Sequence, residues 1–191
     1  MPPKAKFTRE QILNESLLIV RESGIESLTA RTLAKRLGSS ACPIFTVFDN
    51  MEEVITETKQ LAKAEYAKYI QKGLCQEIPF KGVGTQYIMF AKNEPKLFQL
   101  LFMTEADIGS VDQFLPTIDD NYSLILNSVR VPYGLNEVDA KYLYTHLTIY
   151  THGIATLIAR KVVAFTDEDV DRMLSEVFVG LLKELKRRGN D

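Results

Sequence analysis

The sequence predicts an all-α protein. Apolar residues recur at intervals of three and four along most of the 191 residues, and the two-residue alternation typical of strands is absent. Several of these stretches begin after a capping residue and end near a glycine, as helices do. Two parts are expected, with three short helices in residues 1–50 and longer helices in residues 51–191.

The first helix is expected between Thr8 and Gly24. Thr8-Arg9-Glu10-Gln11 has the capping-box pattern, in which the threonine and glutamine side chains satisfy backbone N–H groups of the first turn. Ile12, Leu17 and Val20 fall on one helical face, and Gly24 suits a C-terminal cap.

Helices two and three are expected to follow closely. Thr29 is expected to cap helix two, and Gly38 to end it, because a tight turn needs a positive φ there. The third helix is expected to begin at Ser40 or Cys42, with Pro43 in the first turn, where a proline forfeits no intrahelical hydrogen bond.

Residues 51–191 are expected to form the longer helices. A fourth helix is expected from Asn50 to about Leu74, followed by an interruption at Gly73, Pro79, Gly82 and Gly84. The later helices are expected at Thr85–Asn93, Pro95 to about Ala106, Val111–Ser128 with Pro116 at a start or kink, Asn136–Val163 after a turn at Pro132-Tyr133-Gly134, and Thr166–Arg188.

Residues 28–48 have the spacing of a helix-turn-helix. Ala34 falls where two helices must cross closely, Gly38 falls in the turn, and Ile44 and Val47 return to the same core. With the exit Phe48-Asp49-Asn50-Met51-Glu52-Glu53-Val54, this stretch resembles the N-terminal domain of the TetR family of bacterial repressors. A plain three-helix packing unit would give the same apolar spacing.

The resemblance implies a DNA-binding domain in residues 1–50 and a ligand-binding and dimerisation domain in residues 51–191. Two recognition helices of a homodimer would then read half-sites about 34 to 36 Å apart on double-stranded DNA. The resemblance places these residues at the DNA: Thr29, Arg31, Lys35, Arg36, Ser39, Ser40, Ala41, Cys42, Phe45 and Thr46.

The chemistry of the expected recognition helix is polar but not basic. Serine and threonine hydroxyls can meet several base edges, but no arginine is present for bidentate reading of guanine. Phe45 and Val47 stand where relatives usually place groups that donate to phosphate, so anchoring is expected to shift to helix two and to the Lys4–Lys6 arm. Ser40 as a plain N-cap and Cys42 as a surface residue fit the sequence about as well.

The charge distribution agrees with this placement. The net charge is −2, yet residues 1–48 carry seven basic and four acidic side chains, while the rest of the chain holds the other 16 of the 23 basic and 21 of the 25 acidic ones. Positive charge is therefore concentrated where the motif would meet phosphate. The same bases could also form an ordinary solvated face.

An aromatic-rich interior is expected in residues 51–191, where the resemblance implies a site for an apolar or aromatic small-molecule effector. An apolar cavity with a few polar groups is what such a site needs, although each residue taken alone fits a core position better. The candidates are Tyr66, Tyr69, Tyr87, Phe90, Phe98, Phe102, Met103, Tyr122, Tyr142, His146 and Tyr150.

The last two helices are expected to form the dimer interface. The final helix has a broad apolar stripe that includes Gly180, and the helix before it is apolar on more than one side, which a single neighbour could not cover. The expected interface residues are Leu157, Leu174, Phe178, Leu181 and Leu182. A purely intramolecular core is the alternative.

Other kinds of site have little support in the sequence. No nucleophile, nucleotide-binding or zinc-protease motif is present, so no enzymatic activity and no cofactor are expected. His146 and His152, the only two histidines, lie six residues apart and so on different faces of a helix, and Cys42 and Cys75 form no CxxC motif; no metal site is expected. Gly153 is expected to permit close helix packing, and His152 to make a buried or interface hydrogen bond.

The sequence thus favours a homodimeric, TetR-like transcriptional repressor that a small molecule releases from its operator. With no apolar run of membrane length and no apolar segment after Met1, a cytoplasmic location without membrane contact is expected. The alternative is a helical interaction or scaffold protein that has kept the fold without sequence-specific DNA binding.

Overall fold

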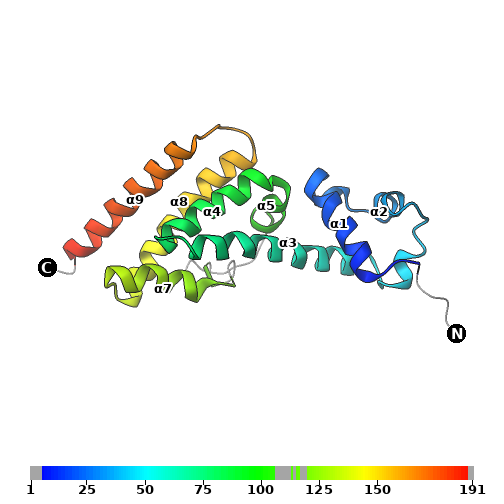
Figure 1. Ribbon diagram of the computed structural model, residues 1–191, viewed down its shortest axis with the longest axis horizontal. Coiled ribbons are helices and arrows are strands. Elements are labelled where there is room, and N and C mark those ends of the chain that lie inside the picture. The colour runs from blue at the N-terminus through cyan, green and yellow to red at the C-terminus, as the bar shows by residue number, and fades with distance from the viewer. Residues whose placement is uncertain (1–5, 106–112, 114, 117–119, 189–191) are drawn as a thin grey trace. The chain divides into compact units, whose positions relative to one another are not determined.

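The computed structural model describes residues 6–105, 113, 115–116 and 120–188, and in this part of the chain helices form without any strand (Figure 1). The all-α prediction is confirmed. The chain divides into two compact units: unit 1 is Met1–Tyr66 with Glu94–Thr104, and unit 2 is Ala67–Asn93 with Glu105–Asp191. This division differs from the expected boundary at residue 50 because helix α3 (Met51–Leu74) contributes to both units and α5 (Pro95–Phe102) packs against the first helix.

Helix α1 (Arg9–Ser23) begins as expected. The Thr8 hydroxyl accepts from Gln11 N at 3.1 Å, and the Gln11 side chain accepts from Thr8 N at 2.9 Å, which completes the capping box. Ile12 and Val20 are fully buried, and Gly24 ends the helix with φ of 86°.

Helix α2 (Ala30–Arg36) also has the expected caps. Thr29 Oγ1 accepts from Thr32 N at its start. At its end Gly38 has φ of 62°, Gly38 N donates to Lys35 O and Ser39 N donates to Ala34 O, which together form a Schellman motif. The predicted tight turn after helix two is confirmed.

The expected third α-helix from Ser40 or Cys42 is not formed. The structure has instead the 3₁₀ turn η2 (Ile44–Thr46), with Pro43 as its N-cap. Two features disfavour an α-helix here: Ile44, Thr46 and Val47 are β-branched, and the Thr46 hydroxyl donates to Pro43 O at 2.7 Å.

Helix α3 follows the prediction, since Asn50 Oδ1 accepts from Glu53 N at 2.9 Å and the helix runs to Leu74. Its first part joins α1, η1 (Ile25–Ser27), α2 and α5 in unit 1. Tyr66 packs edge-on against Phe102 with 4.9 Å between ring centroids.

Helix α4 (Pro79–Asn93) corrects the expected start at Thr85. Pro79 occupies the first turn, where its missing N–H has no intrahelical acceptor, and Gly82 and Gly84 lie inside the helix. Position 82 requires a glycine, because a Cβ built there would lie only 2.3 Å from Gly73 O of α3. The glycines that suggested an interruption therefore mark a close contact of α4 with the end of α3.

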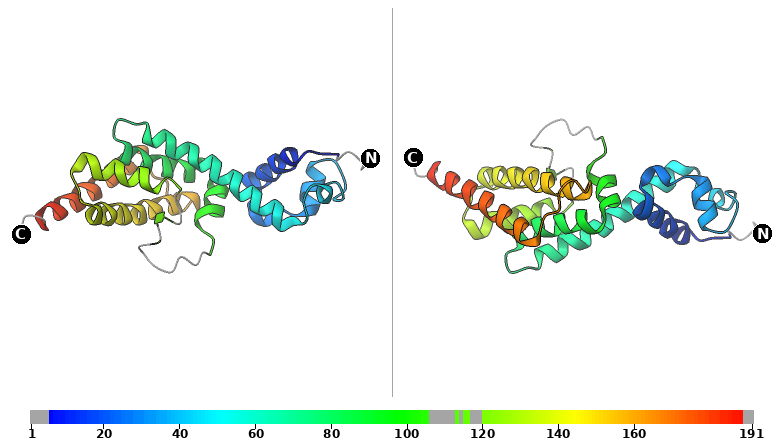
Figure 2. Two further views of the ribbon diagram at one scale, coloured as in Figure 1. Left: turned by 90° about the horizontal axis from the view of Figure 1, so that it is seen from below. Right: turned by 90° about the horizontal axis from the view of Figure 1, so that it is seen from above.

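The later helices described in unit 2 are α7 (Tyr122–Tyr133), α8 (Glu137–Ala159) and α9 (Asp167–Arg188), with α8 and α9 side by side (Figures 1 and 2). Pro132 lies within α7, and the chain turns only at Gly134, which has φ of 64°. The expected extension of α8 to Val163 is wrong, since it ends at Ala159. The helix expected from Pro95 to about Ala106 is shorter, since α5 ends at Phe102 and residues 103–105 are not helical. Of the expected helix Val111–Ser128, residues 111, 112, 114 and 117–119 lie outside the described residues, and its last part belongs to α7, which begins at Tyr122.

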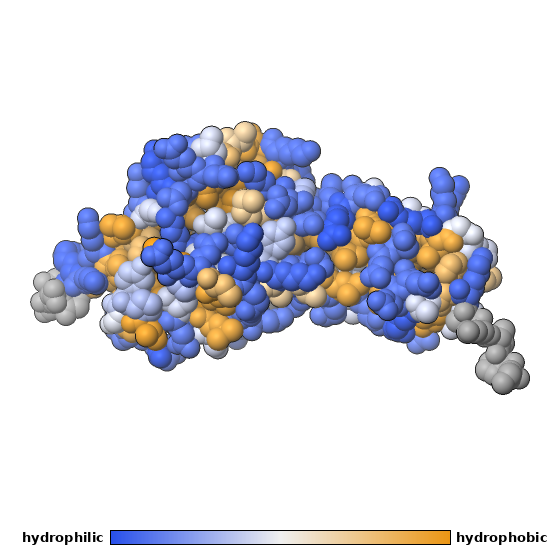
Figure 3. All heavy atoms as spheres, in the orientation of Figure 1, coloured by the Kyte–Doolittle hydropathy of each residue, from blue (hydrophilic) through white to orange (hydrophobic). Residues whose placement is uncertain are grey.

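On the face shown in Figure 3, hydrophilic residues cover most of the described surface. Figure 3 shows apolar atoms at the surface over α7, where Leu124 and Val131 are exposed. In the described part of the chain, no helix has both the length and the apolar character of a membrane span.

Candidate nucleic-acid interface

The segment Ser39–Thr46 lies at the surface of unit 1. Ser40, Cys42, Phe45 and Thr46 are exposed, and Ser39 and Ala41 are half-buried. Ile44 and, beyond the segment, Phe48 are buried and fix it to the core. The six residues expected to face DNA in this stretch are therefore brought together, on a turn rather than on a helix.

Hydrogen bonds orient several of these side chains. Lys6 Nζ donates to Ser39 Oγ at 3.1 Å, which holds the Lys6 side chain beside the segment. Thr29 Oγ1 lies 2.6 Å from Thr32 Oγ1, so the capping hydroxyl of α2 is engaged within its own helix. Cys42 is a free, exposed thiol.

Arg31 and Lys35 are two exposed cations of α2. They lie four residues apart and so on one face of the helix. Among the described residues neither forms an ion pair, so both side chains remain available to an external anion.

Arg36, in contrast, is engaged by α1. Its Nε donates to Glu15 at 2.8 Å, and its Nη1 and Nη2 donate to the two carboxylate oxygens of Glu22 at 2.6 and 2.8 Å. The hydrogen bond with Glu22, and to a smaller extent that with Glu15, raises the pKa of Arg36. The Arg36 guanidinium in turn lowers the pKa of Glu22. An expected phosphate contact is thus already neutralised within the chain.

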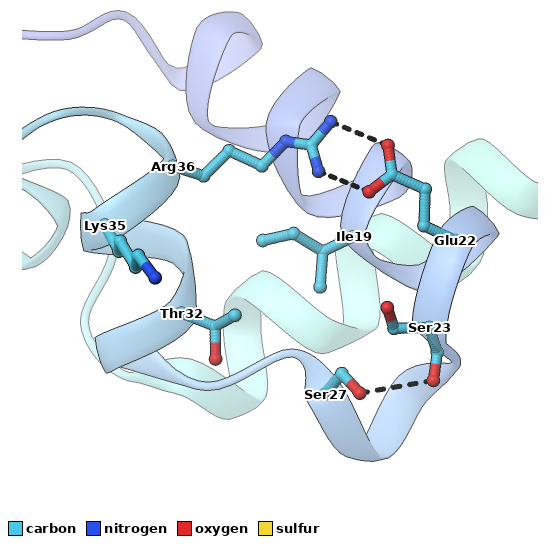
Figure 4. A pocket seen from close by; sticks show the side chains of 7 residues that line it. All are labelled: Ile19, Glu22, Ser23, Ser27, Thr32, Lys35 and Arg36. Atoms are coloured by element: carbon cyan, nitrogen blue, oxygen red, sulfur yellow. Dashed lines mark hydrogen bonds and ion pairs between the residues drawn. The ribbon is translucent and has the colours of Figure 1, made fainter.

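Arg36 also borders a shallow depression of about 370 Å³ between α1, η1 and α2 (Figure 4). Ile19 lies at its centre, and the Ser27 hydroxyl at its edge donates to Ser23 O at 3.1 Å. The lining residues are Ile19, Glu22, Ser23, Ser27, Thr32, Lys35 and Arg36, and none of the expected effector-binding residues is among them.

Arg9 is similarly engaged at the other end of the segment. It donates to Val47 O at 3.1 Å and to Glu57 at 2.9 Å, pairs with Glu53, and lies over the Phe48 ring at 4.2 Å. The hydrogen bond from Arg9 lowers the pKa of both Glu53 and Glu57. Arg21 pairs with Glu94 at 2.8 Å, so three of the arginines counted as positive charge near the motif are neutralised by neighbours.

The expected effector-binding residues are distributed over both units. Tyr66, Phe98, Phe102 and Met103 belong to unit 1, where Phe98 and Phe102 have ring centroids 5.3 Å apart and Met103 is exposed. In unit 2, Tyr69 packs edge-on against Phe90, and Tyr122 stacks on Tyr144. Each of these ring contacts lies within one unit.

Three further expected effector-binding residues lie toward solvent on α8. His146 is exposed, Tyr142 and Tyr150 are half-buried, and the Arg188 guanidinium lies 5.6 Å from the Tyr142 ring centre. They share a helical side with Ile149, which is 56% exposed. This is the second apolar side of the helix that the sequence indicated, and among the described residues it is open.

Some of the expected dimer-interface residues are packed within unit 2, and the others are half-buried or exposed. Leu174 is buried and would touch a Cβ placed at Gly84, and Phe178 packs against Phe80 and Tyr133, so both serve the core of unit 2. Leu181 and Leu182 are half-buried, and Leu157 is exposed.

The two glycines of this pair of helices are open. Among the described residues, nothing lies within 4 Å of a Cβ built at Gly153 or Gly180. Gly153 therefore does not pack closely against any described residue, so the expected close helix packing is not found in this part of the chain.

His152 makes the internal hydrogen bond that the sequence suggested. The Tyr87 hydroxyl lies 2.9 Å from His152 Nδ1, which joins α4 to α8 within unit 2. Burial lowers the pKa of His152 because the charged imidazolium loses hydration.

The lowered pKa predicts a stability that depends on pH. Below about pH 6.5 the unfolded chain binds a proton at this histidine that the folded chain resists, so the free energy of unfolding should fall as the pH decreases from 7.5 to 5.5. Urea unfolding at the two pH values measures this fall. His152→Gln, whose amide can still bond Tyr87, should flatten the dependence, and an equal fall in the variant would assign it to other groups.

No protein-family model and no curated protein sequence matches this chain. In the described part of the chain, no three histidine, cysteine, aspartate or glutamate side chains are grouped to hold a metal ion. The assignment of a function therefore depends on the surfaces described above.

Proposed function

We propose that this chain is a DNA-binding transcriptional regulator, which acts as a homodimeric repressor released by a small-molecule effector. The observation that carries the proposal is the surface around Ser39–Thr46. There an exposed polar segment follows the Schellman turn of α2, and the cations Arg31 and Lys35 of α2 and Lys6 of the N-terminal arm belong to the same unit. Cations support binding to phosphate, and hydroxyls support contact with base edges.

Homodimer formation is supported by the open side of α8 and α9. Ile149 and Leu157 are exposed, Met173 and Val177 are only half-buried, and Gly153 and Gly180 leave room for a close approach. A helix-interior glycine costs about 1 kcal/mol relative to alanine, so two open glycines on apolar helices fit a contact with a second copy.

The proposed release by an effector uses α3, which contributes residues to both units. A ligand bound in the aromatic interior of unit 2 would displace this helix and change the separation of the two reading segments. An effector that binds there should lower operator affinity by the same factor by which operator DNA lowers effector affinity.

A mobility-shift titration with the promoter region of the chain's own gene tests DNA binding. The expected result is a retarded complex that an unrelated duplex competes for poorly. Thr46→Ala should change the preference among sequences more than the overall affinity, since this hydroxyl is proposed to face bases. An equal loss on every sequence would assign Thr46 a role other than base reading.

A second candidate function is a helical interaction protein without sequence-specific DNA binding. The lack of an α-helix over Ser39–Thr46 favours it, as do Phe45 and Val47, whose side chains cannot donate to phosphate. A chain that forms dimers and yet shifts no duplex at low salt would support this candidate.

The dimer predicts opposite outcomes for two leucines. Leu157→Glu should yield a folded monomer, because the carboxylate is solvated in the single chain and would be buried in the dimer, weakening association at least about 100-fold. Leu174→Glu should instead unfold unit 2, because that side chain is buried within the chain. Light scattering with circular dichroism separates these outcomes, and a folded Leu157→Glu dimer would place the interface elsewhere.

A further inference from the structure

The segment Ser39–Thr46 is secured at each end by an arginine that belongs to a neighbouring element or pairs with one. These contacts all lie within unit 1. Neither end is held by the segment's own secondary structure, since it contains only a 3₁₀ turn.

At the first end, Arg36 ties the last turn of α2 to α1. All three kinds of guanidinium nitrogen donate to Glu15 or Glu22, with a bidentate arrangement on Glu22 (Figure 4). Bidentate pairing fixes the orientation of both side chains as well as their distance. Only the turn at Leu37 and Gly38 separates Arg36 from Ser39.

At the second end, Arg9 of α1 holds the exit of the segment. It donates to the Val47 carbonyl, covers the Phe48 ring and pairs with Glu53 and Glu57 of α3. Three elements thus meet at one guanidinium immediately after Thr46.

The segment needs such support because it has few backbone hydrogen bonds of its own. Ile44 N donates to Ala41 O, and Val47 N and Phe48 N both donate to Ile44 O. An α-helix of the same length would be ordered by a continuous series of i to i−4 bonds, which a 3₁₀ turn lacks.

We propose that Arg9 and Arg36 are positioning residues that preorganise Ser39–Thr46 for its target and are not themselves phosphate ligands. The DNA aspect rests on the proposed function, whereas the ordering of the segment does not. Their guanidinium donors face carboxylates of the same unit, and Arg31 and Lys35 remain the cations of α2 that meet phosphate.

Amide hydrogen exchange on the full chain tests the ordering directly. In Arg9→Gln and Arg36→Gln, the amides of Ile44, Val47 and Phe48 should exchange about three to ten times faster relative to the Val20 amide of α1. Arg21→Gln is the matched control, because Arg21 pairs with Glu94 in the same unit away from the segment, and it should leave this ratio unchanged. An unchanged ratio in both Arg9→Gln and Arg36→Gln would overturn the proposal.

A charge-exchange variant distinguishes loss of the ion pair from a general loss of folding. Glu22→Arg combined with Arg36→Glu restores an ion pair between the same two helices and should return the exchange ratio toward that of the unmodified chain. A double variant no better than Arg36→Glu alone would contradict a role for the pair.

The salt dependence of DNA binding separates positioning from phosphate contact. Lys35→Gln should reduce the slope of log K against log salt by about 0.9, whereas Arg36→Gln should keep the slope and lower the preference for specific over random duplex. An equal reduction for Arg36→Gln would overturn the assignment. If the unmodified chain binds no DNA while the exchange ratios change as expected, the proposed function fails and the positioning role stands.

Discussion

Gly82→Ala is expected to destabilise unit 2 by about 2 kcal/mol. The new Cβ would lie 2.3 Å from Gly73 O, and that carbonyl belongs to the backbone of α3, which cannot rotate away as a side chain can. Overpacking of this kind costs about 3 kcal/mol, and the helix propensity gained on replacing glycine offsets about 1 kcal/mol of it. Thermal unfolding should show a fall in Tm of about 8 °C.

Gly153→Ala is the matched control with the opposite sign. Gly153 also lies inside a helix of unit 2, but nothing described lies within 4 Å of its added Cβ. In the monomeric Leu157→Glu background it should stabilise the chain by about 1 kcal/mol through helix propensity alone. Equal destabilisation by both substitutions would contradict the close contact of α3 with α4.

The double variant Arg31→Ala/Lys35→Ala is expected to remove most DNA binding at physiological salt. Both cations are exposed on one face of α2 without a described carboxylate partner, so each is free to displace counterions from DNA. The slope of log K against log salt should fall by about 1.8, and the loss should be similar on every sequence. Fluorescence anisotropy over a range of salt concentrations measures both quantities.

Lys183→Ala provides the control for that variant. It removes an exposed lysine from α9 in unit 2, far along the chain from Ser39–Thr46. Affinity and slope should then remain those of the unmodified chain. A similar fall in this control would mean that the whole surface, rather than α2, attracts DNA.

The sequence predicted helix ends best where a side chain caps the backbone. The Thr8 capping box, the Thr29 cap and the positive φ of Gly38 follow from local chemistry that a few neighbouring residues determine. The start of α4 could not be predicted in this way, because Gly82 looks like a helix breaker until Gly73 is known to lie against it. Contact between distant residues outweighed local propensity there.

The candidate interface was predicted in position but not in conformation or charge. Apolar spacing placed Ile44 and Val47 in the core, but only Ile44 is buried and Val47 is half-buried. The spacing also could not distinguish an α-helix from a 3₁₀ turn over so few residues. Counting charges overstated the free positive charge, because Arg9 and Arg36 pair with glutamates that are distant in sequence.

The aromatic residues show the same limit. Hydrophobic side chains such as Phe90 and Phe98 were expected in one interior, but they belong to different units, and His146 faces solvent. A periodic pattern identifies which side of a helix is apolar, and only the packing of the other elements decides whether that side meets the core or remains open.

Selection from a pool of randomised duplex DNA with the full chain tests the central proposal most directly. The expected result is enrichment of a palindromic sequence whose half-sites lie about 34 to 36 Å apart or a multiple of that, and loss of the enrichment with Leu157→Glu. Retention of no duplex even at low salt, where contacts between cations and phosphate are strongest, would contradict it.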